Sequence, residues 1–488
     1  MPFGRPRHRE GSEGLSTGKN AAYNVAYRVF SVLLPLVTAP YLSRAVGTHG
    51  VGLYSYAWNI SYFACLAAML GLENYGTRAV AAVRDDRKEL DRTFSAIWRM
   101  QRGVAFSALL LWLVYLLLVA DEEKTIALPL TLMSVSCLFN LDWAMMGLES
   151  FRPIALRNTA VKLIAAACVF IFIRREEDLW IYGFAWSAAT CAGNAMNALS
   201  LRRQVSLVKV TRQEALKHLK PCSLLFVSVL ATSVYRVMDK VMVGAIAGQD
   251  QNGLYENAEK IVYCLSGFIS AIGTVMLPKI TDLQRKGETA RILRSLDGTM
   301  QGIMLMTSAM AFGLAAVGER FCILFYGEDF AGSGVLMVPL GFSLMTIGFA
   351  NVIRTQWILP QGRDRIVVRS VCAGAVVNVI ANALLIPSMR AMGAVAGTLL
   401  AEFTVPLVQW LHVRRELPYP GLLWHVLSSA AVGAVMFVCV RLVGQLLPLT
   451  WIGLALQAAV GIAVAAVLTL ALLPASGSPL LRRLCRRH

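Results

Sequence analysis

Residues 201–220, LRRQVSLVKVTRQEALKHLK, separate two long stretches of mostly apolar sequence. The segment holds six basic side chains: Arg202, Arg203, Lys209, Arg212, Lys217 and Lys220. In membrane proteins, lysine and arginine collect in the loops that face the cytoplasm. The segment therefore predicts a cytoplasmic linker between two membrane-embedded halves.

The composition supports this prediction, because the 488-residue chain is 57% hydrophobic and only 15% charged, with a mean hydropathy of +0.59. A soluble chain carries about 25% charged residues. Apolar runs of about 20 residues recur from end to end, each long enough to cross a ~30 Å hydrocarbon core. The alternating pattern of a β-barrel is absent. We therefore expect an all-α integral membrane protein, and we attribute its net charge of +17 to cytoplasmic loops rather than to nucleic-acid binding.

The apolar runs predict fourteen transmembrane helices, with twelve as the main alternative. Basic loops alternate with loops that are poor in lysine and arginine, so the positive-inside rule places both termini in the cytoplasm. The predicted spans are 21–45, 51–74, 94–120, 125–147, 153–173, 179–200, 221–247, 253–278, 293–318, 334–360, 366–387, 392–412, 421–444 and 449–473. The predicted domains are a cytoplasmic tail (1–20), a six-span N-lobe (21–200), the basic linker (201–220), a six-span C-lobe (221–415), two further spans (416–475) and a basic cytoplasmic tail (476–488).

A short internal repeat relates the two lobes. Gly52–Ala57 reads GLYSYA and Gly253–Ala258 reads GLYENA, so four of six positions match at an offset of 201 residues. Each segment opens the second predicted span of its lobe. Six spans per lobe give both lobes the same orientation, so we predict parallel repeats about a pseudo-two-fold axis, with the site between them. The last two spans lie outside the repeat.

Charged residues inside the predicted spans are the candidate site, because a charge at the bilayer centre costs roughly 2.5–3.5 kcal/mol and usually faces a cavity or a partner. Arg236, Asp239 and Lys240 share one face of the seventh span, either as an internal ion pair or as a polar face on a central cavity. The predicted substrate-binding cations are Arg28, Lys162, Arg236, Lys240 and Lys260. The predicted ion-coupling or charge-partner acids are Asp239, Glu402 and Glu256. The cationic excess favours an anionic substrate.

Several of these residues also have a structural explanation. Glu256 precedes Lys260 by four positions, which is a favourable spacing for a helical ion pair. Arg28 lies near enough to a span end to reach the interface, Lys162 is equally explained by a buried partner, and Glu402 by a structural hydrogen bond. For Asp239 we expect the role of neutralising one of its basic neighbours.

No cofactor or metal is predicted. The ten cysteines and six histidines are dispersed, without Cys-x-x-Cys spacing. The loops are short and contain no G-x-x-x-x-G-K-[ST] phosphate-binding motif. Energy is therefore expected from an ion gradient, such as that of protons or sodium, from the membrane potential, from substrate flow or from a separate subunit.

Several motifs, taken in order, resemble those of a transporter family. They are Thr38–Arg44 (TAPYLSR), Tyr75–Arg78 (YGTR), Met238–Lys240 (MDK), Gly253–Lys260 (GLYENAEK) and Leu359–Asp364 (LPQGRD). Over about residues 20–415 the sequence resembles Wzx-type polysaccharide repeat-unit flippases of the multidrug/oligosaccharidyl-lipid/polysaccharide exporter superfamily.

The resemblance implies a two-lobed, MATE-like fold in the bacterial cytoplasmic membrane. It implies transfer of an anionic, undecaprenyl-pyrophosphate-linked oligosaccharide from the inner to the outer leaflet for surface polysaccharide synthesis. The cationic side chains would hold the pyrophosphate or acidic sugars, and the lipid tail would lie in a groove beside spans 13 and 14. Membrane lipids, a polysaccharide polymerase and glycosyltransferases are the implied partners.

Three alternatives stay open. Two belong to the same superfamily: an ion-coupled drug or metabolite exporter, and a lipid II flippase. The third is a membrane enzyme, such as a polysaccharide polymerase or ligase. It is the least favoured, because the outer loops are short and carry no nucleophile or histidine–carboxylate constellation.

Overall fold

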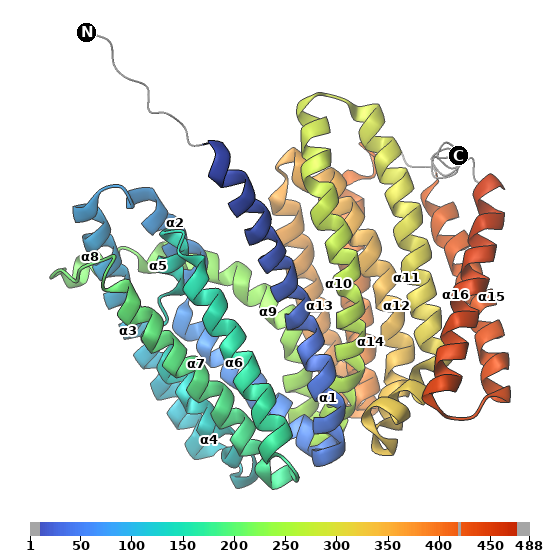
Figure 1. Ribbon diagram of the computed structural model, residues 1–488, viewed down its shortest axis with the longest axis horizontal. Helices are drawn as coiled ribbons and strands as arrows, with labels where there is room; N and C mark the ends of the chain where they lie inside the picture. The colour runs from blue at the N-terminus through green and yellow to red at the C-terminus, as the bar shows by residue number, and fades with distance from the viewer. Residues whose placement is uncertain (1–9, 418–420, 476–488) are drawn as a thin grey trace.

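The computed structural model describes residues 10–417 and 421–475, and these are almost entirely helical, with no β-strand among them (Figure 1). The first half and the linker contain α1 (Glu10–Met69), α2 (Leu72–Val83), α3 (Arg87–Leu118), α4 (Asp121–Ser136), α5 (Asp142–Gly147), α6 (Phe151–Phe172), α7 (Leu179–Leu201) and α8 (Arg212–Leu216). The second half contains α9 (Leu219–Ala247), α10 (Gln249–Arg285), α11 (Thr289–Tyr326), α12 (Ala331–Ile353), α13 (Asp364–Met389), α14 (Ala391–Val413), α15 (Leu422–Leu446) and α16 (Trp451–Ala475).

Ten helices in the described ranges are long and apolar enough to cross a membrane. Together with α4, α7 and the two parts of α1, they account for the fourteen predicted spans. α1 provides two spans because Gly47, with φ 67° and ψ −174°, interrupts the helix. Glycine adopts positive φ without the penalty that other residues meet. The predicted all-α membrane class and the count of fourteen are therefore confirmed.

Two predicted span boundaries are wrong. The second span is predicted to reach residue 74, but α1 ends at Met69, and Leu70 and Gly71 have φ values of 43° and 74°. A Cβ on Gly71 would lie 2.9 Å from the backbone nitrogen of Phe226, so the close approach of α9 favours glycine at this turn. The predicted span 125–147 is likewise two helices, α4 and the short α5.

The two lobes meet where α1 crosses α10, and backbone approaches backbone at that point. A Cβ on Gly52 would lie 1.7 Å from the carbonyl oxygen of Gln249, and a Cβ on Gly253 would lie 2.0 Å from that of Thr48. The two contacts are equivalent: Gly253 lies 201 positions after Gly52, and Gln249 lies 201 positions after Thr48, which is the offset of the sequence repeat. The predicted parallel repeat is confirmed, and its pseudo-two-fold axis passes through this glycine crossing.

A second pair of contacts obeys the same relation. Asn257 Nδ2 donates a hydrogen bond to Ser43 Oγ at 2.8 Å. Its counterpart is the contact of Gly244 with Tyr56, where a Cβ on the glycine would lie 2.6 Å from Tyr56 Cδ2. The crossing is therefore a symmetric interface between equivalent residues of the two lobes.

The remaining helices complete the lobes. α9 joins them: near its start Cys222 is buried with Leu72 and Leu201 of the N-lobe, and further along it packs against α13 and α14. α15 and α16 pack against α11 at the edge of the molecule away from the N-lobe (Figure 1). The two helices outside the repeat therefore extend the C-lobe.

Candidate functional site

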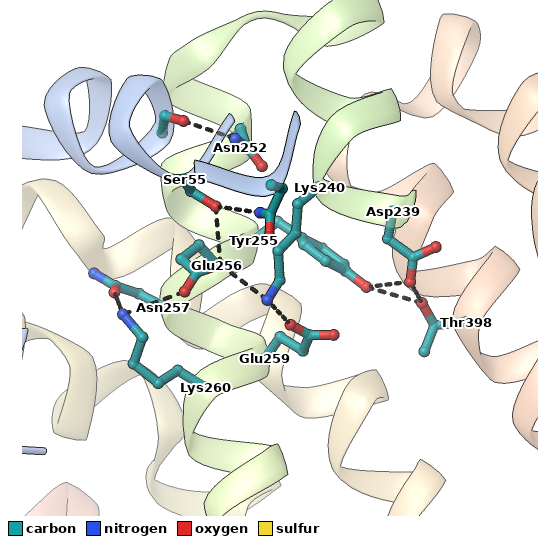
Figure 2. A network of polar contacts seen from close by, with 12 residues as sticks. Ser55, Asp239, Lys240, Asn252, Tyr255, Glu256, Asn257, Glu259, Lys260 and Thr398 are labelled. Carbon is teal, nitrogen blue, oxygen red and sulfur yellow. Dashed lines mark hydrogen bonds and ion pairs between the residues drawn. The ribbon is translucent and has the colours of Figure 1, made fainter. Parts of the chain in front are cut away.

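Asp239 lies on α9, and only 2% of its surface is exposed. Its carboxylate accepts hydrogen bonds from Thr398 Oγ1 at 2.8 Å and Tyr255 Oη at 2.9 Å (Figure 2). It also accepts one from Asn382 Nδ2 at 2.6 Å. These three partners are neutral, and no described basic side chain forms an ion pair with Asp239. Because a buried charge is costly without a counter-charge, this environment suits a carboxyl group that carries a proton or binds a cation.

The number of hydroxyl hydrogens available for hydrogen bonds around Asp239 also indicates a bound proton or cation. Four oxygen–oxygen contacts join Asp239, Tyr255, Thr398 and the carbonyl of Ala394, at 2.8–2.9 Å. The two hydroxyl groups supply one hydrogen each, so two of the contacts lack one. Asn382 Oδ1, nearby, is buried without a hydrogen-bond partner among the described residues. A proton on Asp239, or a hard cation, which prefers oxygen ligands, would satisfy this excess of acceptors.

A cluster of four charged side chains lies next to the Asp239 site, where α9 and α10 meet the N-lobe. Lys240 Nζ lies 3.0 Å from Glu256 Oε2 and 2.7 Å from Glu259 Oε2. Lys260 Nζ lies 3.4 Å from Glu256 Oε1 (Figure 2). Ser55 of the N-lobe donates to Glu256 Oε2 at 3.0 Å, so one carboxylate joins both lysines to the opposite lobe. We call Lys240, Glu256, Glu259 and Lys260 the interlobe cluster.

The interlobe cluster brings together three residues of the predicted site. Lys240 and Lys260 are each partnered by an acid of α10, and the expected pair between Glu256 and Lys260 is present. Asp239 forms an ion pair with neither of its basic neighbours among the described residues, so the expectation that it neutralises one of them is wrong. Lys240 lies next to the α10 carboxylates of Glu256 and Glu259 instead. Glu259, absent from the predicted set, completes a cluster whose two positive and two negative charges balance.

Arg236 and Glu402 lie near these groups but outside them. The guanidinium of Arg236 is exposed and stacks over the ring of Tyr263, 5.0 Å from its centroid. Glu402 on α14 lies beside Tyr235, which precedes Asp239 by one turn on α9. Whether Glu402 has a structural or an ion-coupling role stays a prediction.

The other two predicted cations are in the N-lobe. Lys162 is half-buried on α6, which packs against α7 and α1. Arg28 lies in α1, but its side chain is outside the described residues. Neither position belongs to the interlobe cluster, and their role in substrate binding stays a prediction.

A second group of titratable side chains lies between spans at the end of the molecule predicted to face outward. His49 Nδ1 lies 2.6 Å from Glu176 Oε1 and 3.5 Å from Glu122 Oε1. The donor atoms lie within 4.8 Å of one another, a set that could hold a divalent cation such as zinc. This group was not predicted from the sequence, because its members come from three segments far apart along the chain: α1, the first turn of α4 and the segment between α6 and α7. The hydrogen bond to Glu176 raises the pKa of His49 above its usual value of 6.5.

We expect this cluster to make stability depend on pH. A histidine whose pKa is raised by folding stabilises the fold fully below its unfolded pKa, and this stabilisation is lost as the pH rises through the folded value. His49→Gln should therefore remove a decrease in melting temperature above pH 6.5 that corresponds to roughly 0.2–1 kcal/mol, the range for exposed pairs. Thermal melts of His49→Gln and of the exposed control His412→Gln check this. Equal pH profiles for wild type and His49→Gln would contradict it.

Comparison with known proteins assigns the chain to a family. Residues 17–284, more than half of the chain, match the sequence profile of a family described as polysaccharide biosynthesis protein. A protein named "Putative O-antigen transporter" from Shigella dysenteriae is 21% identical over 387 residues, 77% of this chain and 94% of that protein. A protein of the same name from Escherichia coli (strain K12) is 22% identical over 418 residues, 82% of this chain and 98% of that protein.

Solved structures show the same fold. Lipid II flippase MurJ, in an inward closed conformation, matches with a TM-score of 0.78 at 14% identity, over 93% of this chain and 99% of that one. An inward-facing multidrug resistance MATE family transporter matches with a TM-score of 0.53 at 14% identity, over 79% of this chain and 94% of that one. The fold is thus that of MurJ- and MATE-like transporters. The family profile and this fold together show that the chain belongs to the polysaccharide biosynthesis protein family of membrane transporters.

Proposed function

We propose that the chain is a flippase that moves an anionic oligosaccharide, linked to undecaprenyl pyrophosphate, from the inner to the outer leaflet of the bacterial cytoplasmic membrane. The proposed mechanism is alternating access between the two lobes. One observation carries the proposal: the charged side chains of the interlobe cluster lie where the lobes meet, and Ser55 of one lobe is bonded to Glu256 of the other. The O-antigen transporter relatives and the MurJ-like fold support a lipid-linked sugar as the cargo.

In this proposal Lys240 and Lys260 exchange partners during transport. A pyrophosphate entering between the lobes would replace Glu256 or Glu259 next to the lysines. The released carboxylate would then be buried without a counter-charge, which is unfavourable unless it takes up a proton or a cation. Substrate binding would thereby be linked to cation uptake.

Asp239 is the proposed coupling site for a proton or a sodium ion. Its neutral, oxygen-rich surroundings support either ion, as the excess of acceptors around Thr398 and Asn382 suggests. Glu402, which lies beside Tyr235, is the second candidate. A membrane potential would add to the driving force of either ion gradient.

A mostly apolar groove, whose lining also includes Glu319 and Arg441, supports a place for the lipid tail. It has a volume of about 500 Å³ and lies between α11, α12 and α15. Phe312, Val335, Val338, Phe342 and Phe437 line it. This groove lies beside the thirteenth span, where the resemblance predicts that the tail is held.

We expect Lys240→Gln and Arg236→Gln to reduce export while the protein still folds. A hydrogen bond to a charged group contributes about 1.5–3 kcal/mol, so losing a phosphate contact should lower transport about 10- to 100-fold. The measurement is surface polysaccharide in a deletion strain that expresses each variant, with folded protein quantified by size-exclusion chromatography.

The matched control is Lys286→Gln, an exposed lysine of the same charge, paired with Asp282 at 2.6 Å. Its export should equal that of the wild type. Full export by both Lys240→Gln and Arg236→Gln would refute the assignment of these residues to substrate binding.

The proposed function is tested by the pool of lipid-linked oligosaccharide in a deletion strain, with the leaflet assigned by access of an added glycosidase. We expect complete repeat units to accumulate on the inner leaflet, because the glycosyltransferases that build them and the polymerase that uses them lie on opposite sides of the step. An unchanged pool with normal surface glycan would favour a drug or metabolite exporter. Accumulation of lipid II instead would favour a lipid II flippase, and units stranded on the outer leaflet would favour a polymerase or ligase.

A further inference from the structure

A second pocket lies between the lobes at the end of the molecule predicted to face outward, and the proposed transport cycle does not use it. It has a volume of about 610 Å³. Tyr41 and Arg44 of α1 and Arg174 of the loop after α6 line it from the N-lobe. Phe325 near the end of α11 and Trp451 at the start of α16 line it from the other half of the molecule.

This pocket is positively charged, and its two arginine side chains donate few hydrogen bonds to the protein. Arg44 donates one hydrogen bond, from Nη2 to the carbonyl oxygen of Leu324 at 2.6 Å, and Arg174 donates one to the hydroxyl of Tyr41. Both acceptors are neutral, and neither arginine forms an ion pair with a described acidic residue. A guanidinium carries five N–H donors and matches phosphate with two of them at once. Most of the donors of this pair therefore remain for a ligand.

Two of the three acidic residues that follow Arg174 are engaged elsewhere, and the third, Glu177, is exposed and forms no ion pair with Arg174 in the described part of the chain. The carboxylate of Asp178 accepts hydrogen bonds from the backbone N–H groups of Arg174 and Arg175, at 2.9 and 3.0 Å. Glu176 binds His49, 2.6 Å away. Neither carboxylate is paired with the guanidinium of Arg174, so the pocket keeps its positive charge.

The rest of the lining is aromatic and apolar, which places the pocket at the edge of the bilayer. Phe325 and Trp451 contact each other with ring centroids 6.4 Å apart, and 52% of the surface of Trp451 is exposed. Tryptophan and tyrosine concentrate at the level of the lipid headgroups. Cationic groups above an apolar aromatic surface fit a ligand that joins a phosphate to a hydrocarbon chain.

The pocket also depends on how the lobes are arranged. The bond from Arg44 to Leu324 joins α1 to the last turn of α11, and the lining comes from both halves. The α1–α10 glycine crossing holds the same ends together. Opening the molecule on this side would separate the two walls of the pocket. A ligand that binds only one of two states shifts the equilibrium toward that state.

We propose that this pocket binds the phosphate headgroup of an outer-leaflet lipid and that the bound lipid holds the outer ends of the lobes together. The proposal rests on the proposed flippase function and on the orientation that the positive-inside rule predicts. It assigns to Arg44 and Arg174 a role in returning the transporter to the state that faces the cytoplasm. Lipid composition of the outer leaflet would thereby set how fast the cycle restarts.

The test measures lipid binding to the full-length protein in phosphatidylcholine nanodiscs, with phosphatidic acid as the probe. We expect the variant with Arg44→Gln and Arg174→Gln to bind phosphatidic acid at least about tenfold more weakly than the wild type, which corresponds to ~1.4 kcal/mol. Arg175→Gln is the matched control: it is exposed, lies next to Arg174 and does not line the pocket, so its affinity should be unchanged. If loss of the Arg44 bond to Leu324 impairs folding of the double variant, the single variant Arg174→Gln is measured instead, and it too should bind phosphatidic acid more weakly than the wild type.

A conformational readout separates binding from a merely structural role. Cysteines at Thr48 and Asp250, whose side chains are 2.6 Å apart across the lobes, should crosslink faster when phosphatidic acid is added. With Arg174→Gln the lipid should have no such effect. Equal binding by wild type and double variant, or an equal loss in Arg175→Gln, would overturn the proposal. Inorganic phosphate that competes at the same concentration as the lipid would overturn the assignment to a lipid.

The two proposals fail separately. Binding in nanodiscs needs no oligosaccharide substrate, so loss of binding in the double variant supports the pocket whatever the cargo is. Conversely, inner-leaflet accumulation in the deletion strain, together with unaltered lipid binding by the double variant, would support the flippase and overturn the pocket.

Discussion

Gly253→Ala is expected to reduce export of surface polysaccharide by roughly 5- to 150-fold, although it adds a single methyl group. The new Cβ would lie 2.0 Å from the carbonyl oxygen of Thr48, so the backbones of α1 and α10 must move apart. Overpacking costs about 1–3 kcal/mol, and a bias of that size changes the balance between two conformations by roughly 5- to 150-fold. Because the crossing joins the ends of the lobes that are predicted to face outward, the variant should populate the state closed on that side poorly. Surface polysaccharide in a complemented deletion strain measures the effect.

The matched control lies on the same helix. A Cβ on Gly267 of α10 would meet no described atom within 4 Å, so Gly267→Ala makes the same chemical change without the steric conflict. Its export should equal that of the wild type. If Gly253→Ala exports normally, the glycine crossing is not the contact that closes the outer side.

Asp239→Asn is expected to reduce transport about 100-fold and to remove its dependence on the ion gradient. The substitution keeps the shape of the side chain but removes its negative charge, and hydrogen bonds to a charged group contribute about 1.5–3 kcal/mol each. An amide cannot release a proton or balance a bound cation in place of the carboxylate. Transport by the variant in proteoliposomes should therefore be the same with a sodium gradient, a pH gradient or neither.

The control for Asp239 is another aspartate of the C-lobe. Asp282→Asn, on α10, affects an exposed acid paired with Lys286, and its transport should keep the wild-type ion dependence. The wild-type response to the two gradients identifies the coupling ion. A wild-type protein that ignores both gradients, or an Asp239→Asn variant that responds as the wild type does, would remove Asp239 from the coupling role.

The sequence was sufficient for the architecture because the bilayer constrains it strongly. Apolar runs that must span a fixed thickness specify the helices, and the repeat of Gly52–Ala57 in Gly253–Ala258 specifies how the lobes are related. The structure adds that these glycines touch across the axis. The sequence repeat does not locate the pseudo-two-fold axis. The contact between the two glycine motifs could therefore not be predicted from the repeat alone.

The chemistry of the site was less accessible, because side-chain partners depend on helix rotation and depth. Asp239 was identifiable as a buried charge, but its partners Asn382 and Thr398 are 143 and 159 residues away. Lys240, next to Asp239 in sequence, faces Glu256 and Glu259 instead. Spacing on one helix predicts which residues share a face, and it does not predict which neighbouring helix meets that face.

The boundaries were wrong where a turn is set by a tertiary contact. The predicted second span runs through Gly71, where an apolar pattern continues, yet the approach of Phe226 ends α1 there. The group of His49, Glu122 and Glu176 was missed for a related reason, since three segments far apart along the chain assemble it. In both cases the deciding contact lies far away along the chain.

The most direct test of the central claim is a transfer assay with the lobes crosslinked at their outer ends. Thr48→Cys and Asp250→Cys replace side chains that touch at 2.6 Å across the lobes, and each single variant controls for the native cysteines. Proteoliposomes with a lipid-linked oligosaccharide report transfer by its access to an external lectin. We expect oxidation of the double variant to stop transfer and reduction to restore it, while both single variants transfer normally. Transfer at the wild-type rate by the fully crosslinked protein would contradict alternating access through this interface.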